Sequence, residues 1–533
     1  MKIFVSALVV VAVAVAGCKN DFSAAGRGRG TSGDELIVRA HFIGSDRLLK
    51  DKEAARLKQV WNLKSSIALR DEALNHCARL PFLWLSNSLP GNAPEQAALF
   101  RAVWNDVLAS ESFLEWHATP AFSIATRLSE ARAKLWDAYL RQAVTNWKLG
   151  NPVTVNAGGR SGWELSKLGA PPVRFTRAGD WVAVSVGQGA AALESNLLAR
   201  TKSSEHANGA WLEGDANLAQ FKNRLPGLER FENLPMAHFS LSNRADFVRT
   251  LVQFDFPKPH NWKAEPWQIP TNMIWDPLMD FTVVRGVAGA LDGLPILHDI
   301  GWKTTPNQIC GWGNRNLPFQ LCYFAPMEDV HGQLQRMEPK IRAELVAPQG
   351  LNLLGTIGWD TNRVRLEWRS SGLPVAAPTA ESVGIGAKEY LSLHFFPLIR
   401  TTQQPPRELF EQIAGRNDLV MYDWESTQYR LPTWRQFYQL AEISSRRALT
   451  QTNMPSQRWQ LEVASSLGDA ITELRATSPT EMTLVRKSTI GLTAFEMVTL
   501  SRWMESLDFP AFGVFPPQPP KRIPPRGKAV KPK

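Results

Sequence analysis

A change in hydrophobic period partway along the chain constrains its fold more than any other feature of the sequence. Apolar residues recur at helical spacing from Lys52 to about Lys148, and the period falls to two beyond Gly150. Residues 173–176 and 181–186, separated by a short polar turn, read as the two arms of a β-hairpin. Because strands that pair as hairpins and return through single helices are typical of layered folds, we predict an α+β protein with largely antiparallel sheets.

The strand and helix signals beyond residue 150 fall into two sets with a similar rhythm. We predict a helical region at 34–150, a first α+β unit at 151–300, and a second unit with C-terminal helices at 301–515. The two units are candidates for copies of one repeated unit, although no residue-level similarity links them. The individual predictions that matter below are strands at 235–241, 279–284 and 418–423, helices at 190–200, 244–252 and 407–414, a hairpin within 470–486, and a capping-box helix start at Thr493-x-x-Glu496.

Residues 1–17 have the composition of a signal peptide. Lys2 supplies a positive start, and residues 3–16 are apolar or small with a single serine. Fourteen such residues are too few to cross a hydrocarbon core as a helix, which takes roughly 20. The run ends Val-Ala-Gly-Cys18, which resembles the lipobox, whose cysteine becomes the lipid-bearing N-terminus of the mature chain. The resemblance implies lipidation of Cys18; an ordinary signal peptide cut near Ala16 is the alternative.

Two segments at the ends of the mature chain read as unfolded arms. Residues 18–33 contain four glycines and one large apolar residue, and are predicted to form a flexible tether. Residues 516–533 contain seven prolines, six Lys or Arg and no acidic residue, and are predicted to form a disordered basic tail. Because Lys19 and Asn20 follow the cysteine in place of acidic residues, we predict an outer-membrane lipoprotein that faces the periplasm.

The net charge of +10 lies mostly in these two arms. Removing Lys2 with the signal peptide leaves +9, the tether holds +2 and the tail +6, so the body is nearly neutral at +1. A neutral body does not carry the basic face of a nucleic-acid-binding domain. The arms are suited to an anionic envelope surface, where each cation near the surface contributes on the order of 1 kcal/mol.

The sequence predicts neither a metal site nor a cofactor. Its nine histidines are scattered without ligand spacing, and no Cys-x-x-Cys pair is present. Gly187-x-Gly189-x-x-Ala192 has the spacing of a dinucleotide fingerprint, but it follows the second arm of a hairpin, and a tight β-to-α turn is the favoured interpretation. Beyond Cys18, Cys310 and Cys322 are close enough in sequence to form a disulfide in an oxidising compartment.

Candidate catalytic residues are few. Asp423 and Glu425, in Tyr-Asp-Trp-Glu, lie on one face of an extended segment, and two carboxylates about 5–9.5 Å apart would suit glycoside hydrolysis. A solvated strand face explains this pair equally well. The twenty tryptophans are a compositional outlier; core packing is favoured for most of them, and the loop residues are surface candidates, namely Trp262, Trp267, Trp275, Trp302 and Trp312.

Two segments carry a resemblance to known sequences. Residues 417–430, with Tyr-Asp-Trp-Glu, and residues 478–503, with Leu-Val-Arg-Lys-Ser-Thr-Ile-Gly-Leu-Thr, are similar to uncharacterised bacterial envelope lipoproteins. The resemblance covers most of the body, and it implies no activity and no site residues. The sequence therefore favours a membrane-anchored envelope lipoprotein, not an enzyme, that binds or scaffolds an envelope protein or polysaccharide. The alternative is a hydrolase that acts on envelope polysaccharide through Asp423 and Glu425.

Overall fold

The computed structural model describes most of the chain between Leu36 and Phe509. The signal peptide, the tether with Cys18 and the basic tail, all predicted above, lie outside this part. The described residues are 36–79, 93–118, 121–146, 150–157, 159–166, 171–202, 209–222, 228, 231–244, 247–260, 262, 264–292, 303, 305–315, 321–341, 356–360, 365–369, 379–394, 396, 401–444, 454–506 and 509.

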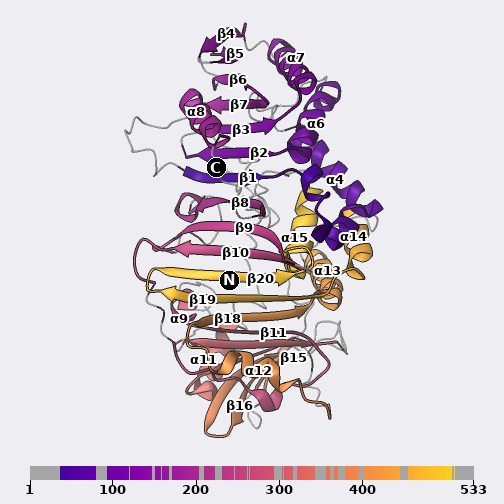
Figure 1. Cartoon of the computed structure of the whole chain (residues 1–533). Coiled ribbons are helices and arrows are strands. Elements are labelled where there is room, and N and C mark those ends of the chain that lie inside the picture. The colour runs from indigo at the N-terminus through magenta and orange to yellow at the C-terminus, as the bar shows by residue number, and fades with distance from the viewer. Residues whose placement is uncertain are drawn as a thin grey trace, which may run out of the picture.

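All twenty strands in this part of the chain join one antiparallel sheet (Figure 1). Each strand pairs with its neighbours in the order β4-β5-β6-β7-β3-β2-β1-β8-β9-β10-β20-β19-β18-β11-β12-β13-β17-β16-β15-β14. The bounds are β1 Leu36–Phe42, β2 Ser112–His117, β3 Ala121–Arg127, β4 Val153–Ala157, β5 Arg160–Leu165, β6 Val173–Ala178, β7 Trp181–Gly187, β8 Ala210–Asn217, β9 Met236–Arg244, β10 Phe247–Asp255, β11 Leu278–Arg285, β12 Gln308–Asn314, β13 Leu321–Pro326, β14 Thr356–Asp360, β15 Arg365–Arg369, β16 Thr379–Ile385, β17 Lys388–His394, β18 Leu419–Ser426, β19 Asp469–Ser478 and β20 Glu481–Ser488.

The strand order shows that one topology occurs twice. Read from the β4 edge the sheet runs 4-5-6-7-3-2-1-8-9-10, and read from the β14 edge it runs 14-15-16-17-13-12-11-18-19-20. Each strand of the first copy, residues 36–255, thus has a counterpart ten labels later in the second copy, residues 278–488. The copies join where β10 pairs with β20, with Leu251 opposite Val485. The α+β prediction is confirmed, and the repeated unit exists as a duplicated topology.

The boundaries of the two copies differ from the units read from the sequence. The predicted helical region at 34–150 contains β1, β2 and β3, which belong to the first copy, and the second copy begins at β11, before residue 300. The predicted helix at 244–252 is instead strand β10, in which Val248, Thr250, Val252 and Phe254 are buried while their neighbours are half-exposed. A polar residue on the buried side, Thr250, and an apolar residue on the other side, Leu251, weaken this period-two pattern in the sequence.

Helices cover the two faces of the sheet and one end of its strands. None of the helices in the described ranges is long and apolar enough to span a membrane. Their bounds are α2 Ser45–Leu48, α3 Ala55–Trp61, α4 Lys64–Cys77, α6 Ala93–Ala109, α7 Glu130–Asn146, α8 Ala190–Arg200, α9 Ala288–Asp292, α11 Val330–Ile341, α12 Arg407–Ala414, α13 Thr427–Ser444, α14 Pro455–Ala464 and α15 Ala494–Met504, with short 3-10 turns at Lys52–Ala54, Leu218–Phe221 and Thr271–Met273.

Equivalent helices of the two copies cover equivalent faces. In the first copy, α6 and α7 pack on the face of the sheet that carries Trp163 and Val182, and α8 packs on the opposite face against Phe113 and Ala125. In the second copy, α11 packs on the face of Leu391, and α12 packs on the opposite face. The two copies therefore share their layers as well as their strand order.

A small helical bundle at one end of the strands forms a separate core. Helices α4, α13, α14 and α15 gather beside the ends of the central strands (Figure 1). The predicted capping box is confirmed: Thr493 Oγ1 accepts a hydrogen bond from the Glu496 backbone N–H, and the Glu496 carboxylate accepts one from the Thr493 N–H. The Gly187–Gly189 segment forms the β-to-α turn into α8, where Gly189 has a φ of 77°.

Candidate functional site

Asp423 and Glu425, the carboxylates proposed from sequence for catalysis, are buried structural groups. They are 2% and 1% exposed on β18. Asp423 accepts a hydrogen bond from the Thr282 hydroxyl on the neighbouring strand β11. Glu425 accepts hydrogen bonds from the Ala494 N–H at 2.7 Å and the Thr427 hydroxyl at 3.2 Å. Because Ala494 is the first residue of α15, Glu425 caps that helix, and an anion at a helix N-terminus is stabilising.

We expect Glu425→Gln to lower the free energy of unfolding by about 1–2 kcal/mol, because it removes the charge that faces the N-terminus of α15. Urea denaturation measures the change. The matched control is Glu481→Gln, a half-exposed carboxylate on β20, which we expect to leave stability within about 0.5 kcal/mol of the wild type. Unchanged stability in Glu425→Gln would contradict the capping role.

Cys310 and Cys322 are free thiols, so the disulfide considered from the sequence is not formed. They lie on neighbouring strands β12 and β13 but out of register, since Cys310 faces Phe324 and Cys322 faces Trp312. Diagonal neighbours in an antiparallel pair have Cα atoms roughly 7–8 Å apart, beyond the usual limit for a disulfide. Trp312, a surface candidate from the sequence, is buried in the same core.

Both thiols should be almost inert toward thiol reagents while the protein is folded. Burial raises the pKa of Cys322 to about 12 and also raises that of Cys310. Since the thiolate is the reactive form, at pH 8 only roughly 1 in 10,000 molecules carries it at Cys322, against about a quarter for an ordinary cysteine. Labelling with Ellman's reagent should therefore be slow in buffer and complete in guanidinium. Rapid labelling of either residue in the native protein would refute the buried packing.

One face of the central strands carries half-exposed, mostly polar side chains and is here named the central face. On β10 and β9 the buried side chains point to the hydrophobic core, and the intervening ones are half-exposed on the other side. In Figure 1 these strands cross the middle of the molecule between α8 and α12, which both pack on this side of the sheet. The residues of the central face are Arg39, Glu213, Asp215, His238, Ser240, Ser242, Arg249, Leu251, Gln253, Asp255, Ile471, Glu473, Arg475, Glu481, Thr483, Val485 and Lys487.

One charged network on the central face lies in the first copy. Asp215 on β8 contacts Arg39 on β1 and His238 on β9, and His238 Nε2 lies 3.2 Å from the Asp255 carboxylate on β10. Strand pairing explains this arrangement, because Asp215 lies opposite both Arg39 and His238 in register. The network spans four strands at their solvent side, where His238 is 42% exposed.

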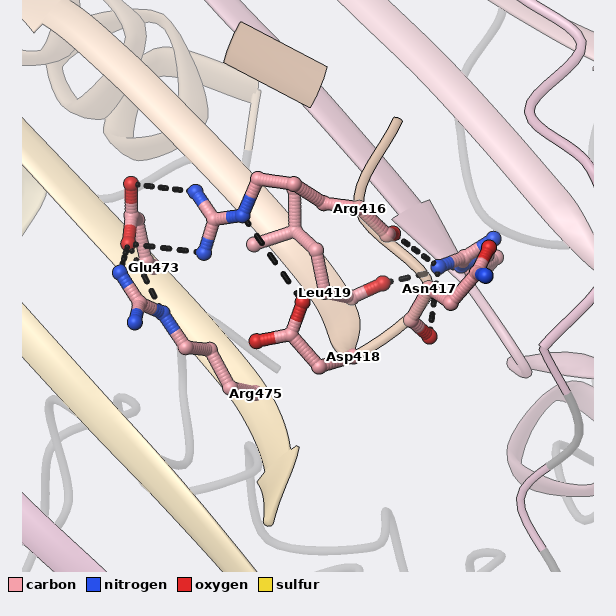
Figure 2. A network of polar contacts seen from close by, with 7 residues as sticks. Arg416, Asn417, Asp418, Leu419, Glu473 and Arg475 are labelled. Carbon is pink, nitrogen blue, oxygen red and sulfur yellow. Dashed lines mark hydrogen bonds and ion pairs between the residues drawn. The ribbon is translucent and has the colours of Figure 1, made fainter. Parts of the chain in front are cut away.

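A second charged network lies in the second copy (Figure 2). Arg416 donates to both carboxylate oxygens of Glu473 at 2.9 and 3.2 Å, and Arg475 donates to the same carboxylate from the other side. Burial would raise the pKa of Glu473, but the hydrogen bonds from the two arginines outweigh it and leave that pKa below its usual value. Its hydrogen bond to Glu473 raises the pKa of Arg416 in turn. Glu473 and Arg416 therefore keep their charges at neutral pH.

The central face carries both signs of charge in nearly equal numbers. Four arginines or lysines stand among five carboxylates, interspersed across six strands; they are Arg39, Arg249, Arg475 and Lys487, with Glu213, Asp215, Asp255, Glu473 and Glu481. No group of three His, Cys, Asp or Glu side chains converges as a metal site within the described ranges. Sequence reasoning missed this surface because its residues come from six strands. The strand β10 that could have indicated it overlaps the helix predicted at 244–252.

Comparisons with known proteins show only distant structural neighbours. No family model matches the chain, and no curated protein matches it. Crystal form III of TP0453 is similar at 10% identity and a TM-score of 0.22, covering 41% of this chain and 76% of that chain. Crystal form I of TP0453 gives 12% identity and a TM-score of 0.19, covering 43% and 77%. At these TM-scores the likeness carries no argument about this chain.

Proposed function

We propose that this protein is a lipid-anchored binding protein of the bacterial envelope, which docks another envelope protein on its central face. The observation that supports the proposal is the wide, half-exposed sheet face between α8 and α12. The proposed anchor at Cys18 and the tether of 16 residues, at most about 3.6 Å each, would hold the body within roughly 60 Å of the membrane. The buried positions of Asp423 and Glu425 give no support to the hydrolase alternative.

The charge pattern favours a protein as the partner. A polyanion such as lipopolysaccharide or nucleic acid selects a surface of one sign, whereas this face alternates arginine, lysine and carboxylate groups. Alternating charges are complementary to a protein surface that also carries both signs, and such complementarity sets specificity and association rate. Half-exposed Leu251, Val485 and Ile471 add apolar contact area between the charges.

The test is site-specific photocrosslinking of the full chain in cells. A photoreactive phenylalanine analogue is placed at Thr483 or Ser240 on the central face, and at Leu461 on α14, which is 59% exposed, as the control position. We expect one protein to be captured from the central face but not from Leu461. Capture should fall at least tenfold when Arg249→Glu and Lys487→Glu are added, and remain when Lys58→Glu on α3 is added instead.

Each other outcome would overturn the proposal in its present form. Capture of glycan fragments in place of protein would make the central face a polysaccharide site. Equal capture at Leu461 and at the central face, or capture unaffected by the Arg249→Glu and Lys487→Glu changes, would show that this face does not select a partner. If the chain were neither cleaved nor lipidated at Cys18 and were released by the cells, the lipid-anchored part of the proposal would be wrong. The crosslinking results would then test the docking surface alone.

A further inference from the structure

A pocket with wholly apolar walls lies in the first copy, on the side of the sheet opposite α8. It has a volume of about 80 Å³ and is lined by fourteen residues, none of which contributes a polar surface atom. Helices α6 and α7 form one wall, and strands β3, β5, β6 and β7 form the other. The largest lining side chains are Phe100, Trp104, Phe122, Trp136 and Trp163.

The walls determine what chemistry the pocket can accept. A polar group placed there would lose its hydration without gaining a hydrogen bond, which costs several kcal/mol. The part of any ligand inside must therefore be hydrocarbon. Apolar cavities of about 150 Å³ stay dry and bind benzene or xenon, so a pocket of about half that size fits the end of an alkyl chain. Trp104 and Val107 on α6 are only half-buried, so this wall of the pocket lies near the protein surface.

The described parts of the two copies can be compared on this face of the sheet. In the second copy, α11 packs on the equivalent face, with Val330, Leu334 and Met337 against Leu366 and Leu391. The segment between β11 and β12 contains the five-residue helix α9 within its described part, whereas the segment between β1 and β2 contributes the seventeen-residue helix α6. The pocket of the first copy thus lies beneath two described helices, α6 and α7.

We propose that this pocket binds the alkyl chain of a lipid. The proposal is independent of the central face, which lies on the other side of the sheet. Two lipids share this chemistry: the acyl chain proposed on Cys18 of the same molecule, and a separate membrane lipid or fatty acid. A tether of 16 residues spans at most about 58 Å when fully extended. The experiment therefore includes one comparison for each source.

The test measures binding of palmitate by the full chain through displacement of a fluorescent fatty acid. Ala143 on α7 is buried and lines the pocket, so Ala143→Leu fills it. Ala138→Leu, an exposed position on the same helix, is the matched control. We expect Ala143→Leu to weaken binding at least tenfold and Ala138→Leu to bind like the wild type. Should Ala143→Leu unfold the protein, Val107→Phe on α6 blocks the pocket from its other wall.

Comparing the wild-type chain with Cys18→Ser, which lacks the proposed lipid anchor, distinguishes the molecule's own acyl chain from a separate lipid. Palmitate binding that is stronger in Cys18→Ser than in the wild-type chain would show that the pocket holds the molecule's own lipid. Equal binding in both would show that it takes a separate one. Palmitate that does not displace the probe saturably from Cys18→Ser overturns the proposal. So does equal binding by Ala138→Leu and by a folded Ala143→Leu or Val107→Phe variant.

Discussion

Replacing Arg285 by alanine is expected to lower the free energy of unfolding by about 3–5 kcal/mol. Arg285 ends strand β11 and is 1% exposed. Its guanidinium donates to the backbone carbonyls of Glu265, Arg416, Asn417 and Leu419, three of which are drawn in Figure 2. Removal of this side chain would leave the buried Leu419 carbonyl and three part-buried carbonyls without their shared donor. An unsatisfied buried acceptor costs about 1–3 kcal/mol.

Two tryptophans add to the expected effect of the Arg285 change. The guanidinium lies over the rings of Trp267, at 4.3 Å from the centroid, and Trp262, at 5.3 Å. Both belong to the proline-rich stretch that connects the two copies. The contacts of Arg285 therefore hold this stretch against β11 and the start of β18. The sequence had suggested these tryptophans as surface candidates, and the structure gives them a structural partner instead.

The measurement is chemical denaturation monitored by tryptophan fluorescence. Arg249→Ala, on the half-exposed side of β10, is the matched control and should change stability by less than about 0.5 kcal/mol. Arg285→Lys keeps the charge but loses the planar fork of donors, so we expect an intermediate loss. If Arg285→Ala and Arg249→Ala proved equally stable, the carbonyl cluster would not depend on Arg285.

Glu496→Ala is expected to cost about 3–5 kcal/mol, because it leaves Arg486 buried without its carboxylate. Arg486 on β20 is 2% exposed and its guanidinium lies 2.6 Å from the Glu496 carboxylate on α15. It also donates to the Thr472 hydroxyl and the Gly491 carbonyl. Glu496 completes the capping box with Thr493, so the same substitution removes a helix cap.

Matched variants separate the two contributions of Glu496. Thr493→Ala removes one capping bond and leaves the ion pair, so it should cost only about 1 kcal/mol. Replacing both partners, in Arg486→Met with Glu496→Leu, removes the unpaired charge and should recover most of the stability lost in Glu496→Ala. A double variant as unstable as Glu496→Ala would show that the loss comes from packing and not from the unpaired arginine. Thermal denaturation of the four proteins under the same buffer decides between these outcomes.

Local patterns predicted many individual elements of this fold. The hairpin β6–β7, helix α8, helix α12 and the capping box at Thr493 all follow from short-range rules of turn, period and capping. The same patterns missed strands β1, β2 and β3 inside the predicted helical region and predicted a helix at β10. Strand β1 has only seven residues and precedes a long helical stretch. No local sequence pattern therefore predicts its pairing with β2 and β8.

The candidate site was less predictable than the fold. The pair Asp423 and Glu425 looked accessible because alternation alone does not say which face of a strand is covered, and here helices added later in the chain cover it. The central face was missed because Thr250 on the buried side and Leu251 on the half-exposed side interrupt the alternation of polar and apolar residues in β10. Side-chain burial in a sheet depends on its packing layers, and these are set by contacts between distant segments.

The pairing of β10 with β20, which joins the two copies, can form only late in synthesis of the chain. Strand β10 ends at Asp255, and the partner that closes its second side, β20, begins at Glu481, 226 residues later. Until those residues emerge, the first copy presents a nine-residue strand with unpaired backbone groups, which is a template for pairing with another chain. A fragment ending near residue 277 should therefore associate through β10 into a symmetric dimer, in which a second β10 takes the place of β20.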